Sequence, residues 1–160
     1  MDYSDDKVRF EIEREGSDDI VELEFEGEQP FDRVLGALGL EAATHLFERD
    51  KDEPLAGNCA GRRHMRLLAH SHRAIDVTVR YEQHSKDHRF PSSATVFKVL
   101  QWAVGKAGYR LDPTLAAKAN LILPGAEQPL PRDRTIGSLT KPGHPELVVD
   151  LTLKDFTNGC

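Results

Sequence analysis

The order of apolar and polar residues occurs twice along the chain, and this repetition restricts the fold more than any other feature of the sequence. In the first half, residues 8–12 and 21–25 alternate apolar with charged side chains, which is the period of strands with one buried face. Residues 31–38 have apolar side chains at helical spacing, and residues 46–48 and 65–68 predict two further strands. The predicted order is therefore strand, strand, helix, strand, strand.

The second half repeats this order with a clearer alternation. We expect strands over residues 75–81 and 88–90 with a polar turn between them (83–87), a helix over 96–107, and strands over 121–123 and 147–153. In this interpretation Gly108 and Pro113 close the helix. No run of Gly or Pro lies between His70 and Ile75, so we expect little relative motion of the two halves.

The length of the chain agrees with two small domains. Units of roughly 75 residues fold alone, and 160 residues hold two of them. We place the domains at residues 1–72 and 73–154 and treat residues 155–160 as a tail without apolar periodicity, which we expect to be exposed.

Charge and composition exclude several classes of function. Residues 1–73 carry 18 acidic and 10 basic side chains, whereas residues 74–160 carry 9 and 11. An acidic first half argues against a nucleic-acid partner, because phosphate binding needs clustered Lys and Arg. No segment approaches the ~18 apolar residues of a membrane span, and the acidic start differs from a signal peptide. Two cysteines are too few for a disulfide framework, so we expect a cytoplasmic protein.

Three short motifs in the second half resemble ubiquitin in order and spacing. Residues 120–125 (Asn-Leu-Ile-Leu-Pro-Gly) are similar to its third strand and the following turn, 134–139 to the next loop and short helical turn, and 91–96 to the entry of its central helix. The resemblance implies an α+β fold of two tandem ubiquitin-like β-grasp domains. Tandem domains followed by a glycine resemble the two-domain interferon-induced modifier and the BilA-type ubiquitin-like proteins of bacterial antiphage operons.

The resemblance implies a protein modifier that is conjugated through its tail. The tail residues are Asp155, Phe156, Thr157, Asn158, Gly159 and Cys160. In the family an activating enzyme uses ATP to adenylate the terminal glycine, a carrier enzyme takes over the acyl group, and a lysine of the target protein receives it. Gly159 is the implied conjugation residue. Glycine suits this role because it lacks a Cβ and tolerates unusual backbone angles.

Cys160 departs from the family pattern. One interpretation is a one-residue propeptide that a processing peptidase removes; others are an addition to the natural chain, a frayed terminus, or a thiol with its own exchange chemistry. The modifier itself would be no enzyme and would need no cofactor. A non-conjugated β-grasp adaptor and, with less support, a sulfur carrier are the alternative functions.

The outward face of the second sheet is the expected recognition surface, because ubiquitin carries an apolar patch there. The matching positions are Ile122, Asp150 and Thr152, with Val148 nearby. Only Ile122 keeps the apolar character of the family, so we expect dedicated partners rather than ordinary ubiquitin readers.

Other residues have structural explanations. The His70-Ser71-His72 group and the pair His84 and His88 lack the four converging ligands of a zinc site, so we expect no metal and interpret them as solvated polar positions at the domain junction. Cys59 has no neighbouring base and is expected to be a half-buried loop residue. Trp102 is either a partner-binding aromatic or is partly buried against the other domain.

Overall fold

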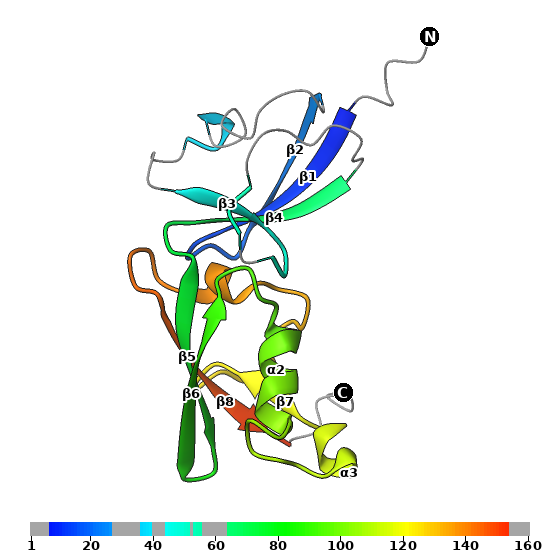
Figure 1. Cartoon of the computed structure of the whole chain (residues 1–160), viewed down its shortest axis with the longest axis vertical. Coiled ribbons are helices and arrows are strands. Elements are labelled where there is room, and N and C mark those ends of the chain that lie inside the picture. The colour runs from blue at the N-terminus through cyan, green and yellow to red at the C-terminus, as the bar shows by residue number, and fades with distance from the viewer. Residues whose placement is uncertain (1–6, 27–35, 40–43, 52, 56–63, 154–160) are drawn as a thin grey trace.

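The computed structural model describes residues 7–26, 36–39, 44–51, 53–55 and 64–153, and it contains two four-stranded sheets (Figure 1). The first sheet consists of β1 (Lys7–Arg14), β2 (Ile20–Glu26), β3 (His45–Glu48) and β4 (His64–His70). The second part contains β5 (Ala74–Tyr81), β6 (His84–Pro91), α2 (Val96–Val104), α3 (Pro113–Ala116), β7 (Asn120–Ile122), the 3-10 helix η2 (Ile136–Leu139) and β8 (Glu146–Thr152).

Both sheets have the same topology. Their strand orders are β2-β1-β4-β3 and β6-β5-β8-β7. In each sheet the first two strands form an antiparallel hairpin, and the first strand pairs in parallel with the last. The third strand is antiparallel to the last. This arrangement confirms the predicted α+β class with two ubiquitin-like β-grasp domains.

The core of the first domain follows from the alternation in its strands. Val8, Phe10 and Ile12 point to one face of β1 and are almost fully buried. Met65 and Leu67 on β4 lie in register with Phe10 and Ile12 and are buried with them. The helix expected over residues 31–38 lies only partly within the described residues, because residues 31–35 are outside them.

The second core is built by α2 against its sheet. Thr95 caps the helix because its side-chain oxygen accepts a hydrogen bond from the Lys98 N–H at 3.3 Å. Four residues of one helix face are buried with the inner faces of β5, β7 and β8; they are Val96, Val99, Leu100 and Ala103. The helix ends at Val104 with Gly105 as its C-cap, three residues before the predicted end.

Two elements of the second domain differ from the sequence prediction. β6 begins at His84, so the turn consists of Glu82 and Gln83 and the proposed polar turn over 83–87 is wrong. Residues 84–89 are all exposed because β6 is an edge strand, and such a strand has no apolar alternation to reveal it. The short helix α3 was not predicted; it starts with an Asp112 side-chain cap and Pro113.

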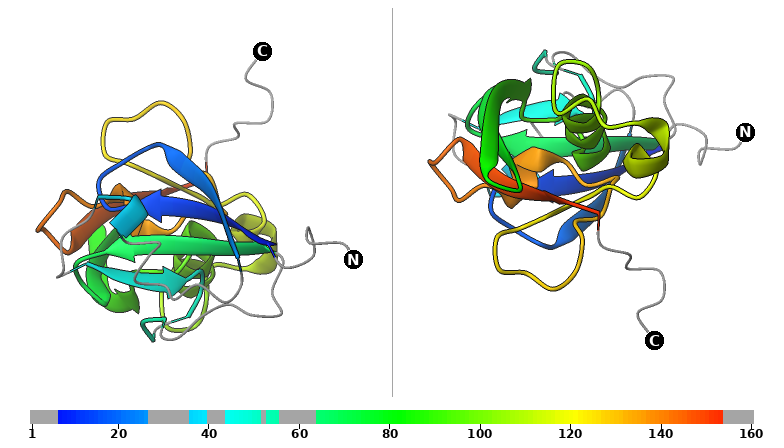
Figure 2. Two further views of the ribbon diagram at one scale, coloured as in Figure 1. Left: turned by 90° about the horizontal axis from the view of Figure 1, so that it is seen from above. Right: turned by 90° about the horizontal axis from the view of Figure 1, so that it is seen from below.

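The two domains pack against each other through one seam. We define the domain seam as Glu13, Glu15, Asp50, Leu68 and His70 of the first domain together with Ser93 and residues 134–143 of the second. η2 contacts β1 and β4 there, and it lies directly beneath the first sheet in Figure 1. Figure 2 shows the domains overlapping when viewed from either end. The seam accords with the limited domain motion that we expect from the short connection.

None of the helices in the described part of the chain has the length and apolar character that a membrane span requires.

Candidate functional site

The outward face of the second sheet brings together the four positions proposed for recognition. Along β8, Leu147, Val149 and Leu151 are buried, whereas Val148 is 41% exposed. Asp150 and Thr152 share the face of Val148 and are partly buried. Ile122 on β7 lies opposite Asp150 in the register and is also partly buried.

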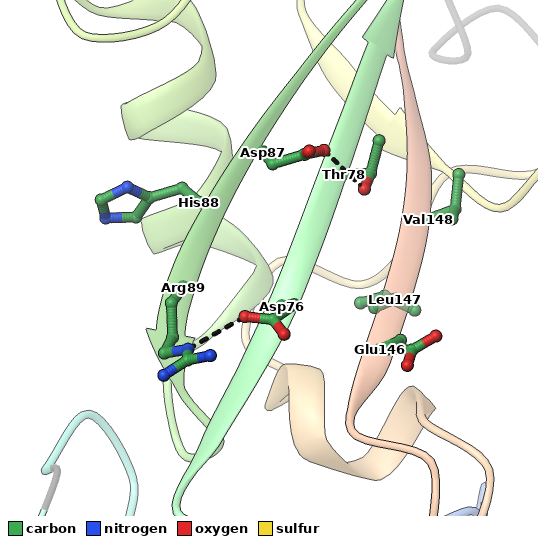
Figure 3. Close-up of a pocket in the computed structure, with 8 residues that line it drawn as sticks. All are labelled: Asp76, Thr78, Asp87, His88, Arg89, Glu146, Leu147 and Val148. Carbon is green, nitrogen blue, oxygen red and sulfur yellow. Dashed lines mark hydrogen bonds and ion pairs between the residues drawn. The ribbon is translucent and has the colours of Figure 1, made fainter.

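Cross-strand pairs of polar side chains cover most of this face. The Arg80 guanidinium donates two hydrogen bonds to the Asp150 carboxylate, at 2.5 and 3.0 Å. These hydrogen bonds, and the opposite charge, raise the pKa of Arg80 above its usual value. Arg89 pairs with Asp76 at 2.9 Å (Figure 3). Asp150 is therefore engaged within the sheet.

A shallow groove of about 540 Å³ runs along this face beside the charged pairs. Its lining comprises Asp76, Thr78, Asp87, His88, Arg89, Glu146, Leu147 and Val148. In Figure 3, Thr78 donates to Asp87, an interaction of 2.7 Å. A second hollow of about 520 Å³ lies at the β5–β6 turn and includes Arg80 and Asp150. Three cross-strand pairs lie among the residues that line these two hollows: Thr78 with Asp87, Arg89 with Asp76, and Arg80 with Asp150.

The residues predicted for conjugation and processing lie outside the described part of the chain. β8 ends at Thr152 and Leu153 is the last described residue before the tail. Gly159 and Cys160, the tail positions 155–158, and Cys59 therefore receive no structural test.

Trp102 packs inside the second domain rather than against the first. Its ring is stacked on His88 with centroids 5.2 Å apart, and it meets the ring edge of Phe90 at 5.8 Å. The expectation that Trp102 is buried against the neighbouring domain is wrong, because α2 places Trp102 over β6 instead.

The histidine group at the domain junction is not solvated as predicted. His70 is fully buried, with 0% exposure, because η2 covers this end of β4. Glu15, His70 and His72 each have one possible metal-ligand atom, and these three atoms lie within 4.8 Å of one another. Each of them already takes part in hydrogen bonds: Glu15 accepts from Ser71 and Gly143, His70 accepts from the His72 N–H, and the His72 ring contacts Ser71. We read this group as a hydrogen-bond network.

The contact between the domains was not predicted from the sequence, although one sequence feature indicated it. Leu67, Leu68 and Ala69 are consecutive apolar residues, and all three are buried. A strand with one buried face alternates, so an unbroken apolar run indicates burial on both faces. Glu13 gave no such signal, because a buried glutamate looks like a surface residue in the sequence.

Glu13 is held in the seam by partners from the second domain. Its carboxylate lies 3.0 Å from the Arg134 guanidinium and accepts the Thr135 N–H at 3.2 Å. Burial raises the pKa of Glu13, and these two partners offset the rise only in part. Arg134 also donates to the Ser17 carbonyl oxygen.

A comparison with family models supports a ubiquitin-like fold for the second half of the chain. Residues 76–154 match the family model described as BilA ubiquitin-like domain 2. No curated protein matches the chain. A protein of Arabidopsis thaliana, solved from evolutionary couplings and sparse NMR data, is similar over 55% of this chain and 95% of its own, with 16% identity and a TM-score of 0.37. From the sheet topology and the family match, the second half of the chain is a ubiquitin-like β-grasp domain similar to domain 2 of BilA.

Proposed function

We propose that the protein is a ubiquitin-like modifier that is joined to target proteins through Gly159. The observation that supports this most is the match of residues 76–154 to a ubiquitin-like domain, in a chain whose two sheets share the β-grasp topology. Such a domain is a non-enzymatic unit whose chemistry is supplied by partner enzymes. The proposed domain limits remain residues 1–72 and 73–154.

The proposed chemistry uses the chain as an acyl donor. A peptidase would first cleave the bond after Gly159 and free its carboxylate. That carboxylate would attack the α-phosphate of ATP on an activating enzyme, which releases pyrophosphate and gives an acyl adenylate. An enzyme thiol would displace AMP to form a thioester, and a carrier enzyme would receive the acyl group on its own thiol. A target lysine amine would then displace that thiol and form an isopeptide bond.

The outward face of the second sheet is the proposed docking surface for these enzymes. Ile122 and Val148 offer apolar area, and Asp150 and Thr152 lie beside them. Because Asp150 is bound by Arg80, a partner meets a charge-paired surface rather than a free carboxylate. The resemblance to BilA-type proteins supports a role in bacterial antiviral defence in the cytoplasm, in which attachment of a two-domain body would disable an assembling target.

The test is an activation assay with the cognate activating enzyme. The chain trimmed after Gly159 is incubated with this enzyme and ATP and analysed by mass spectrometry and non-reducing gels. We expect an adduct on the enzyme that thiols reverse, and we expect none when Gly159 is also deleted. Replacing Asn158 with Ala is the matched control and should leave the adduct in place.

The same assay separates the alternative functions. The groove beside Val148 is the observation that favours an adaptor. An adaptor would form no adduct and would keep its cellular activity after residues 155–160 are deleted. A sulfur carrier would show replacement of one carboxylate oxygen by sulfur at Gly159. Either result would contradict the modifier proposal.

A further inference from the structure

A buried histidine lies where the two domains meet. His70 is the last residue of β4 and its side chain is 0% exposed. Leu68, on the same face of β4, is also 0% exposed and lies outside the apolar core of the first domain. A Cβ added at Gly137 of η2 would come within 2.6 Å of Leu68 and 2.9 Å of His70. The second domain therefore covers both side chains directly.

The hydrogen bonds around His70 fix its neutral form. Nδ1 accepts the His72 N–H at 2.8 Å and therefore carries no proton. Nε2 must then hold the ring proton, and it lies 3.0 Å from the Thr140 hydroxyl oxygen in the second domain. That hydroxyl donates onward to the Gly137 carbonyl oxygen at 2.9 Å. Both ring nitrogens are used, and one of the two bonds crosses the seam.

A second proton on the ring has no good place in this arrangement. It would sit on Nδ1, where it would point at the His72 N–H, so two donors would face each other. The nearest acceptor, Glu15 Oε1, is 3.8 Å away and already accepts two hydrogen bonds from Ser71. The His70 cation would thus be buried with its new proton unsatisfied.

Other titratable groups face His70 from several elements. Glu15 and His72 lie beside its ring, and His45 is its partner in the β3–β4 register. From the second domain the facing groups are the uncharged Thr140 and Gly137. The charged pair of Glu13 and Arg134 lies further along the seam.

We propose that His70 acts as a proton-sensitive latch that holds the two domains together while it is neutral and weakens their docking when it becomes protonated. The latch would operate in the two folded domains and would not depend on conjugation through the tail. Opening would expose Leu68 and its register partner Phe47, which is also 0% exposed. Acid would thus uncover an apolar surface that is sealed at neutral pH.

The direction of the pH effect follows from linkage. Burial lowers the pKa of His70, and the Glu15 charge offsets this only in part. A histidine with a lowered pKa in the docked state stabilises docking fully above its undocked pKa, and this stabilisation is lost as the pH falls toward the docked pKa. The docking constant should fall about tenfold for each pH unit between these two values.

The carboxylates of the seam do not explain a loss of docking in mild acid. Burial alone would raise the pKa of Glu15, but hydrogen bonds from Ser71 and Gly143 hold it below its usual value, so Glu15 keeps its charge in mild acid. The pKa of Glu13 is raised, so its protonation would favour docking in acid, opposite to His70. A loss of docking in the window between about pH 7.5 and about pH 5.5 is therefore assigned to His70.

Amide hydrogen exchange in the intact chain can test the latch. The Asp50 N–H crosses between the domains to the Ser93 carbonyl oxygen at 2.9 Å, and neither group titrates. Two internal amides serve as references: Arg49, bonded to Arg66 in the first domain, and Tyr109, bonded to Ala103 in the second. We expect the protection factor of Asp50, relative to both, to fall over the window by up to about tenfold.

Three variants make this result specific to His70. His70→Gln can still donate to Thr140 but cannot titrate, so the relative protection of Asp50 should no longer fall as the pH is lowered through this window. His72→Gln and His45→Gln should behave like the wild type. An unchanged wild-type protection ratio, or the same fall in His70→Gln, would overturn the latch.

A second measurement applies even if His70→Gln does not dock. NMR titration of the ring protons in the wild type should give a midpoint for His70 below that of histidine in an unstructured reference peptide. A His70 midpoint equal to or above the peptide value would refute the proposal.

Discussion

At the scale of single residues, the contact between the domains depends on positions where a Cβ would not fit. Gly137 is buried and faces the Leu68 methyl groups and the Ser92 carbonyl oxygen. Gly16, at the turn between β1 and β2, has φ +70° and lies against Pro142 and Thr140. Two glycines from different domains therefore allow two surfaces to approach closely.

Substitution of Gly137 by Ala should destabilise the protein. The new Cβ would lie 2.6 Å from Leu68 Cδ2 and 2.8 Å from the Ser92 carbonyl oxygen, and the backbone oxygen cannot move aside cheaply. Overpacking of this kind costs about 1–3 kcal/mol, measurable as a lower midpoint in urea unfolding. Gly36→Ala is the control, because a Cβ there meets nothing within 4 Å. Equal midpoints for the two variants would show that the seam is looser than described.

At the scale of elements, caps and edges explain where the helices and strands begin and end. α2 is bounded by Thr95 and Gly105, and α3 begins where Asp112 and Pro113 satisfy its first turn. β6 continues as an edge strand through six exposed polar residues because the backbone bonds to β5 hold it.

Removal of the α2 cap should weaken the second domain. Thr95→Ala deletes the acceptor for the Lys98 N–H, and the loss of such a cap costs about 1 kcal/mol. Thr95→Ser keeps the hydroxyl and should recover most of the loss. Thermal unfolding followed by circular dichroism measures the difference; a Ser variant as unstable as the Ala variant would assign the effect to packing of the lost methyl group.

Strands with one buried face could be predicted from the sequence, whereas the remaining features could not. β1 and β5 alternate apolar and polar residues because one side of each faces a core, and β8 has buried residues at every second position although Val148 on its other face is also apolar. The full length of β6 could not be predicted, because the strand is held by backbone hydrogen bonds, which leave no pattern in the sequence. At the candidate site, alternation gave the shared face of Ile122 and Asp150, but the Arg80 partner depends on strand order, which the alternation alone does not specify.

At the scale of the whole molecule, the two domains should unfold as one unit. The connection between β4 and β5 comprises only residues 71–73, and backbone, side-chain and ionic contacts bridge the seam. Loss of the second domain would leave Leu68 and Glu13 without the groups that cover them.

A calorimetric scan near pH 7.5 should therefore show a single transition whose van't Hoff and calorimetric enthalpies agree. Leu68→Ala removes a buried side chain from the seam and should lower the midpoint, with a loss of about 2–5 kcal/mol. Val148→Ala, on the exposed face of β8, is the control and should change stability little. Two separate transitions in the wild type would contradict a single cooperative unit.

The burial of Phe47 and Leu68 limits how many binding partners one copy can engage. In the register of their sheets these residues correspond to Ile122 and Asp150, yet the first pair is fully buried whereas the second is partly exposed. A chain with two similar folds thus presents one such surface and is monovalent toward any protein that reads it. Avidity, where it occurs, would have to come from several copies placed close together.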